Sequence, residues 1–358
     1  MLSAIASSLR ARLGRPIRRH QTMTRRSCHA AAAMLGLLAL AGCAARLAPA
    51  GPAVEPPRLG RQAFVMPDGM RLPYRVWPAH HGQAPPWAVM LALHGMDDSR
   101  DAFAIPAPAF AAAGVTVIAP DQRGFGATAT RGLWPGTSSL VNDARTMVGL
   151  IAARYPGLPV FVLGESMGAA VAALLAAGPH PPVAGFVLVS PAVWGWQGLN
   201  MFERAGLWVM THFLPGLTVS GGGLHIRASD NLAALIALSR DPLTLLSTRW
   251  DAVGGLVRLM GQAARAAPRL PGNALILYGG HDELVPKRAM RAFWKGLRPP
   301  PAGPRVAYYP GAYHLMLRDL ARAVPIGDIL AWMRAPEAPL PSHAGRAARR
   351  WMRQGGMQ

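Results

Sequence analysis

The sequence predicts an α/β fold with a mostly parallel central sheet, helices on both faces of the sheet and a helical cap inserted after the sixth strand. Three observations carry this prediction. Short apolar runs alternate with segments of helix length, the runs are unbroken, and the alternation stops between Trp194 and about Pro268. Unbroken apolar runs indicate strands that are buried on both faces, as in parallel sheets. The long interruption predicts the cap, at about residues 194–268.

The expected strands follow from the apolar runs in chain order. Asp68-Gly69 separates two short runs within residues 64–77, which is typical of a hairpin with a tight turn. Six further strands are expected at residues 87–93, 115–119, 160–163, 186–189, 274–278 and 306–309. Helices are expected at residues 141–154, 167–177 and 287–296.

The composition indicates one large folded domain with extensions. The chain has 358 residues, of which 51% are hydrophobic and 15% charged, so it can bury enough apolar surface to exclude disorder for its bulk. Half of the net charge of +20 lies in the two ends of the chain. The cations between the ends are scattered, without the basic runs and aromatic residues of nucleic-acid-binding modules. We therefore expect no nucleic-acid partner.

The N-terminal segment predicts an exported lipoprotein. Arg25 and Arg26 precede an apolar run at residues 30–41, which is too short to span a bilayer but suits the core of a signal peptide. The run ends in Leu40-Ala41-Gly42-Cys43, which resembles the lipobox of bacterial lipoproteins. The resemblance implies a signal peptide at residues 1–42 and lipidation of Cys43. The alternatives are an uncleaved membrane anchor and a true start at Met23.

The cysteine content is consistent with export. The two cysteines are Cys28 and Cys43, and only Cys43 would remain after cleavage, so no disulfide could form within the mature chain. Its acyl chains would hold the protein to a membrane of the bacterial cell envelope. Ala44, in place of an Asp, favours the outer membrane facing the periplasm. Residues 43–60 are rich in Ala and Pro and predict a tether, residues 61–335 the folded domain, and residues 336–358 a basic tail. This tail is either a solvated end or a contact with anionic lipid.

A possible nucleophile lies between the strand expected at residues 160–163 and the following helix. The segment reads Gly164-Glu165-Ser166-Met167-Gly168, in the strand–turn–helix context that the G-x-S-x-G motif requires. The glycines permit a sharp turn, which holds the serine hydroxyl at the helix N-terminus, clear of the sheet. Ser166 is therefore the predicted nucleophile. The alternative is a glycine-rich turn without chemistry.

A serine hydroxyl needs a base, usually a histidine oriented by a carboxylate. In α/β hydrolases these residues follow the chain order serine, acid, histidine. Asp282 follows the penultimate expected strand and His314 the last one, so these two are the predicted acid and base. Glu283 is a competing acid and His281 a competing imidazole.

The oxyanion of an acyl-transfer intermediate needs two backbone N–H donors. Met167, directly after the nucleophile, is one predicted donor because it lies at the positive end of its helix. Met96, after His94-Gly95 at the end of an early strand, is the other.

These residues resemble the α/β-hydrolase superfamily and, within it, the monoacylglycerol lipase and lysophospholipase-like group, of the serine aminopeptidase S33 type. The resemblance extends over about residues 64–333. It rests on Leu93-His94-Gly95, on the segments at residues 121–126, 164–168 and 280–286, and on Gly311-Ala312-Tyr313-His314. It implies the α/β-hydrolase fold, a Ser166–Asp282–His314 triad and oxyanion donors at Met96 and Met167. We interpret Asp121 and Arg123 as a structural pair.

The resemblance implies a serine hydrolase that cleaves carboxylic esters through an acyl-enzyme on Ser166, without a metal or an organic cofactor. Four aromatic residues of the insertion, Trp194, Trp196, Phe202 and Trp208, are predicted to bind substrate. An apolar cap and a membrane anchor favour a lipid-like ester, such as a monoacylglycerol or a lysophospholipid. The alternatives are a serine peptidase or amidase on small substrates and a non-catalytic binding lipoprotein with this fold.

Overall fold

The computed structural model of the chain contains two compact units, Met1–Cys43 and Ala44–Gln358. The structure describes residues 45–80, 84–220 and 226–355, all within the second unit, and the description below concerns that unit. The predicted signal peptide and Cys43 lie outside the described residues. In the described ranges, no helix is long and apolar enough to cross a membrane.

In these ranges nine strands form one sheet, in the order β1-β2-β3-β5-β4-β6-β7-β10-β11. Strands β1 to β3 pair antiparallel, β3 pairs antiparallel with β5, and the pairs from β5 to β11 are parallel. This confirms the predicted mostly parallel sheet. The strands are β1 (Arg58–Leu59), β2 (Ala63–Val65), β3 (Arg71–Trp77), β4 (Ala88–Leu93), β5 (Val115–Pro120), β6 (Val160–Glu165), β7 (Gly185–Val189), β10 (Ala274–Gly279) and β11 (Arg305–Tyr309).

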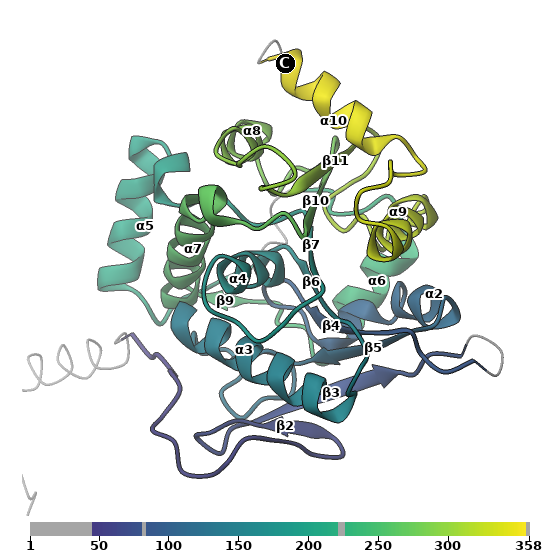
Figure 1. Cartoon of the computed structure of the whole chain (residues 1–358). Coiled ribbons are helices and arrows are strands. Elements are labelled where there is room, and N and C mark those ends of the chain that lie inside the picture. Colours follow the sequence, from purple (N-terminus) through teal and green to yellow (C-terminus); the bar gives the residue numbers. More distant parts are fainter. Residues whose placement is uncertain (1–44, 81–83, 221–225, 356–358) are drawn as a thin grey trace, which may run out of the picture. The chain divides into compact units, whose positions relative to one another are not determined.

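Helices cover both faces of the sheet, as predicted (Figure 1). One hydrophobic cluster joins the sheet to α3, α4, α7, α8 and α10, and a second joins its other face to α2 and α9. Because both faces are covered, every residue of β4, β5 and β6 is buried, which explains their unbroken apolar sequences. The helices outside the insertion are η1 (Arg100–Phe103), α2 (Ala107–Ala112), α3 (Thr137–Arg154), α4 (Met167–Ala176), α8 (Lys287–Lys295), α9 (Ala323–Arg334) and α10 (Ala344–Arg353).

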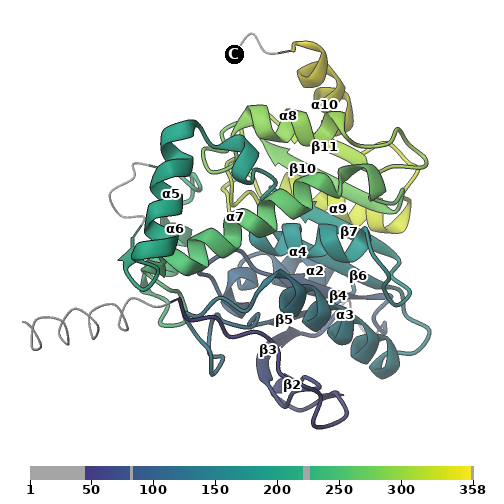
Figure 2. The same ribbon diagram turned by 90° about the vertical axis from the view of Figure 1, so that its left-hand side faces the viewer.

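The insertion between β7 and β10 is not a single protruding cap. It contains η2 (Trp196–Gly198), α5 (Met201–Phe213), β8 (Thr218–Val219), α6 (Leu232–Arg240), β9 (Thr248–Arg249), α7 (Trp250–Arg265) and η4 (Ala267–Arg269). Helix α7 packs against α4 (Figure 2) and belongs to the core, because its side chains at positions 257, 259, 260 and 263 are buried. Helices α5 and α6 each bury one residue. Within the insertion, α7 therefore belongs to the core, whereas α5 and α6 are mostly exposed.

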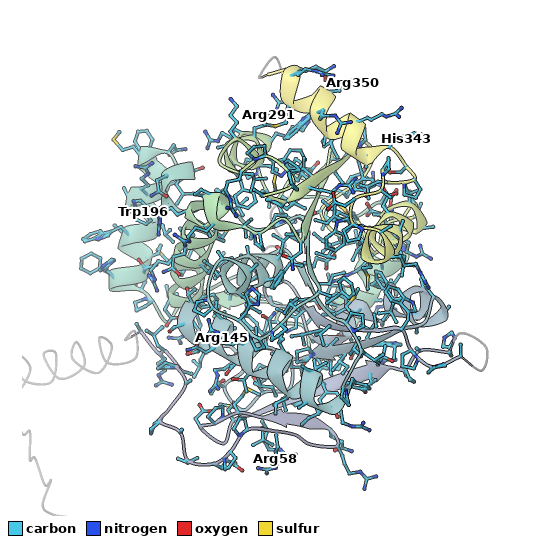
Figure 3. All side chains as sticks on the ribbon, in the orientation of Figure 1. Arg58, Arg145, Trp196, Arg291, His343 and Arg350 are labelled. Atoms are coloured by element: carbon cyan, nitrogen blue, oxygen red, sulfur yellow. The ribbon has the colours of Figure 1, made fainter. Side chains whose placement is uncertain are left out.

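The basic tail differs from a solvated end. Its residues Ala344–Arg353 form α10, which packs against β11. Trp351 is buried, and its ring stacks on that of Tyr308 with centroids 4.9 Å apart and planes 15° apart. The guanidinium of Arg291 on α8 lies 4.4 Å from the centre of the Trp351 ring. Arg350 lies exposed on the outer side of α10 (Figure 3), where it is accessible to anionic lipid. The contact with lipid itself stays a prediction.

The described part of the expected tether also lies on the domain. The Arg46 amide donates to the Asp251 carboxylate at 3.0 Å, and the Ala50 amide donates to the Ser139 hydroxyl at 2.9 Å. The Ala48 amide donates to the Trp134 carbonyl at 3.0 Å. Residues 45–50 are thus held by backbone hydrogen bonds, which the Ala/Pro-rich composition does not reveal.

Candidate active site

The serine predicted as nucleophile lies at a sharp turn between β6 and α4. Its φ of 55° and ψ of −113° are strained for a residue with a side chain. Two glycines make the turn possible. A Cβ on Gly164 would lie 2.3 Å from the Gly168 carbonyl oxygen, and a Cβ on Gly168 would lie 2.1 Å from the Leu93 carbonyl oxygen. The missing side chains therefore let α4 begin directly against β4 and β6, and Ser166 at this turn is partly exposed.

The predicted acid and base meet at the carboxyl ends of β10 and β11. The Nδ1 atom of His314 lies 2.8 Å from Oδ2 of Asp282, and both side chains are buried. Because Nδ1 faces a carboxylate, it carries a proton and leaves Nε2 free to accept one. The other carboxylate oxygen, Oδ1, accepts the amides of Leu284 and Val285, each at 2.9 Å. The carboxylate is thus held on both sides.

The pKa of His314 is raised above its ordinary value. Burial alone would lower it, but the Asp282 carboxylate and its hydrogen bond outweigh burial. Glu165 raises this pKa further, whereas the Arg318 guanidinium lowers it. An imidazole in this setting is a strong base, as removal of a hydroxyl proton requires.

The competing acid and imidazole point elsewhere. Glu283 is exposed and accepts the Arg227 amide at 2.8 Å. His281 is also exposed and lies edge-to-face on the Tyr313 ring, with centroids 5.1 Å apart. Of the two carboxylates, Asp282 is the one that contacts His314.

The loop after β4 brings the predicted donor Met96 beside the nucleophile. A Cβ on Gly95 would lie 3.4 Å from the Cβ of Ser166 and 4.0 Å from its hydroxyl oxygen, so the backbone that leads into Met96 runs directly beside the nucleophile. The second predicted donor, Met167, is the first residue of α4, where the helix offers its amide no carbonyl partner. Both donors therefore belong to segments that adjoin Ser166.

His94 fastens this loop in a way that the sequence did not reveal. The Gln122 amide donates to Nε2 of His94 at 3.0 Å, so the ring proton resides on Nδ1, which donates to the Gly95 carbonyl at 2.8 Å. The Gln122 side chain donates to the His94 carbonyl at 2.7 Å. Burial lowers the pKa of His94 and keeps the ring neutral. The ring thereby holds the peptide that precedes Met96.

Asp97, next in the loop, connects it to the insertion. Its φ is 61°, and its carboxylate accepts the hydroxyl of Thr248. Its carbonyl accepts the Leu245 amide at 2.8 Å. Burial raises the pKa of Asp97 to about 6, against the Thr248 hydrogen bond and with a contribution from the Asp98 charge. The ionised form of the Asp97 carboxylate is therefore destabilised by its burial in the folded protein.

The four aromatic residues predicted to bind substrate do not gather in one cavity. Phe202 is 79% exposed, Trp208 47% and Trp196 41%. Trp208 stacks on His212 of the same helix, with centroids 4.7 Å apart, and Trp196 lies on the insertion at the edge of the molecule (Figure 3). Trp194 is half-buried against the core. Three of the four therefore form exposed apolar surface, with Phe202 and Trp208 on α5 and Trp196 on η2.

Asp121 and Arg123 are structural, but they do not pair with each other. Asp121 accepts the side chain of Arg100 and the Ala127 amide. The buried Arg123 guanidinium contacts Asp68 at 2.7 Å and Asp143 at 2.8 Å. The sequence placed both residues after one strand, whereas the fold supplies each with a partner from another segment.

A buried ion cluster was missed from the sequence. The Nη2 atom of Arg318 donates to Asp98 at 2.6 Å and to Glu165 at 2.7 Å. Glu165, a charged residue at the end of an otherwise apolar strand, was a signal that could have revealed it.

Comparisons with known proteins identify the family to which the chain is similar. A family model described as serine aminopeptidase, S33, matches residues 84–321. The monoacylglycerol lipase of Mycolicibacterium smegmatis is 27% identical over 283 residues, which cover 76% of this chain and 95% of that protein. The human monoglyceride lipase is 27% identical over 260 residues, which cover 72% of this chain and 84% of the human protein.

Solved structures show the same fold. The crystal structure of Paleococcus ferrophilus monoacylglycerol lipase matches with a TM-score of 0.60 and 22% identity, over 73% of this chain and 98% of that one. A soluble variant of the Saccharomyces cerevisiae monoglyceride lipase, in complex with a substrate analogue, matches with a TM-score of 0.65 and 19% identity. The match covers 83% of this chain and 99% of that one. The chain has the α/β-hydrolase fold and belongs to the serine aminopeptidase S33 family.

Proposed function

We propose that this chain is a serine-dependent carboxylic ester hydrolase that acts on lipid-like esters such as monoacylglycerols or lysophospholipids. The observation that carries the proposal is the buried hydrogen bond between His314 and Asp282, at the same sheet edge as the strained turn of Ser166. The named activities of the relatives from Mycolicibacterium smegmatis and human support the ester chemistry and the lipid-like substrate.

In the proposed reaction, the Ser166 hydroxyl attacks the ester carbonyl while Nε2 of His314 takes its proton. Asp282 stabilises the imidazolium that results, and the amides of Met96 and Met167 donate to the oxyanion. The protonated His314 then gives its proton to the leaving alcohol, and water releases the acyl group from Ser166. In this proposal, the hydrogen bond from the Ser166 hydroxyl to Nε2 of His314 forms when substrate binds, because catalytic hydrogen bonds often reach their full geometry only in the substrate complex.

The surface of the insertion supports a lipid-like substrate. Met201 and Phe202 at the start of α5 are 73% and 79% exposed, and Phe213 at its end is 59% exposed. An exposed apolar surface of this kind favours a lipid interface over bulk water. In this proposal α5 brings the site to the substrate at such an interface.

Labelling with a fluorophosphonate probe tests the serine chemistry. We expect wild-type protein to label, Ser166→Ala to lose the label, and Ser239→Ala, which changes an exposed hydroxyl on α6, to keep it. Native protein that does not label would favour a non-catalytic binding protein instead.

Hydrolysis of acyl esters of graded chain length tests the substrate class on residues 44–358, which form one compact unit. Faster turnover of long acyl esters supports the proposal, and equal turnover of all lengths contradicts it. The family description favours a second candidate, a serine peptidase or amidase. Cleavage of small peptide amides in preference to every ester would establish that alternative.

We also propose that Cys43 is lipidated and holds the protein in the bacterial envelope, at the outer membrane facing the periplasm. The motif Leu40-Ala41-Gly42-Cys43 and the following Ala44 support this placement. Labelled palmitate should enter the wild-type protein and not Cys43→Ser, and the labelled protein should fractionate with the outer membrane. A Cys43→Ser variant that stays in the membrane with its N-terminus uncleaved would instead indicate a signal anchor.

A further inference from the structure

The ion cluster around Arg318 lies directly behind the candidate active site. The Arg318 side chain is 5% exposed, Glu165 2% and Asp98 8%. A single nitrogen, Nη2, donates to both carboxylates. A buried guanidinium between two carboxylates is costly to break, because removal of one member leaves an uncompensated charge in a low-dielectric environment.

Each member of the cluster belongs to a different segment of the site. Glu165 directly precedes Ser166, and Asp98 follows Met96 by two residues. Arg318 follows His314 by four residues, in a turn closed by the Arg318 amide on the Leu315 carbonyl at 2.7 Å. One guanidinium therefore connects the segment of the nucleophile, the loop of an oxyanion donor and the loop of the base.

We propose that Arg318 is a positioning residue, which holds these three segments in the one arrangement that the reaction requires. The inference rests on the proposed function, because it concerns the same hydrolytic site. Among the hydrogen bonds and ion pairs of the described residues, no other side chain connects all three segments.

The charges of the cluster also reach the base. The charged groups that act on His314 are Asp282, Glu165 and Arg318, and Asp98 faces Arg318 from the other side. Burial raises the pKa of Glu165, and Arg318 counteracts this. Loss of the Arg318 charge should raise the pKa of His314, and loss of the Glu165 charge should lower it.

The chain offers a matched control. Arg123 is also buried and also bridges two carboxylates, Asp68 and Asp143. Its partners belong to the hairpin and to α3, and neither adjoins a predicted catalytic group. Substitution of Arg123 should therefore break a buried ion cluster of the same kind without displacing the segments of the candidate active site.

The test compares Arg318→Lys, Arg318→Gln and Arg123→Gln by the pH dependence of kcat and KM on one ester. We expect Arg318→Gln to lower kcat by roughly 10- to 100-fold with little change in KM, as misplaced reacting groups do. The acid limb of its kcat–pH profile should move to higher pH, because the pKa of His314 rises and His314 must be neutral to act as a base. Arg318→Lys keeps the charge, so its acid limb should stay in place while its kcat falls.

Two further variants keep the test decisive if Arg318→Gln does not fold. Glu165→Gln should move the acid limb to lower pH, and the double variant Glu165→Gln/Arg318→Gln should return it toward the wild-type position while kcat stays low. The proposal is overturned if Arg123→Gln lowers kcat as much as Arg318→Gln at a temperature where both are folded. It is also overturned if Arg318→Lys has wild-type kcat.

The rate of fluorophosphonate labelling separates this inference from the proposed function. Wild-type protein that does not label contradicts the hydrolase itself. Wild-type and Arg318→Gln proteins that label at equal rates contradict only the role of Arg318. Titration of the His314 imidazole by NMR measures the pKa changes without any substrate.

Discussion

The imidazole of His314 and the carboxylate of Asp282 form a buried hydrogen bond of 2.8 Å between residues 32 positions apart in the chain. The carboxylate is held from behind by two backbone amides, and the imidazole turns Nε2 away from it. This pair fixes both the tautomer and the orientation of the base, so its disruption should affect the reaction more than the fold.

Replacement of Asp282 by Asn should lower kcat by about 10⁴-fold, because an amide facing Nδ1 no longer requires a proton on that atom and the wrong tautomer becomes available. Glu283→Gln, one residue along and exposed, should retain wild-type kcat. Steady-state kinetics on one ester, with circular dichroism to check folding, measure both. A retained kcat in the Asp282 variant would remove this carboxylate from the mechanism.

Replacement of Gly164 by Ala should destabilise the fold and displace the nucleophile. The added methyl would lie 2.3 Å from the Gly168 carbonyl oxygen, a distance that forces the backbone to move. Overpacking of this kind costs about 1–3 kcal/mol. The control is Gly206→Ala on α5, where nothing lies within 4 Å and the helix should gain up to about 1 kcal/mol. Urea unfolding measures both, and equal effects would contradict the tight turn.

Replacement of Asp97 by Asn should stabilise the protein above about pH 6. The folded-state pKa of Asp97 is about 6 and its ordinary value 3.8, so the wild-type protein loses stability as the pH rises between these values. Asn stays neutral, accepts the Thr248 hydroxyl and tolerates a positive φ. The gain should be about 1–3 kcal/mol at pH 7.5 and much smaller at pH 4. Urea midpoints at the two pH values measure it, and a gain independent of pH would contradict this origin.

Replacement of Trp351 by Ala should cost about 3–5 kcal/mol, as loss of a large buried side chain does. The indole packs among Tyr278, Trp294 and Tyr308, so its removal should also release α10. Arg349→Ala, an exposed change on the same helix, should alter stability by less than about 0.5 kcal/mol. Urea unfolding and limited proteolysis of residues 336–358 distinguish the two variants. A tail that is cleaved equally fast in wild-type protein would be a solvated end.

The sequence by itself determined the parallel sheet and the three residues proposed for the reaction. Buried strands leave continuous apolar runs, and a nucleophile turn needs glycines at fixed spacing around Ser166, so both are local signals. The chain order of Ser166, Asp282 and His314 follows from the strand order, because each side chain stands where a parallel strand ends.

Only the tertiary structure decided which distant groups meet. The partners of Arg123 and Arg318 come from segments far away in the chain, and charges leave no periodic pattern that identifies a partner. The division of the insertion into the core helix α7 and the exposed helix α5 likewise depended on which apolar face found a neighbour. The basic tail depends on tertiary contacts in the same way. Helix α10 packs on the domain because the Trp351 indole is buried and stacks on the ring of Tyr308 in β11.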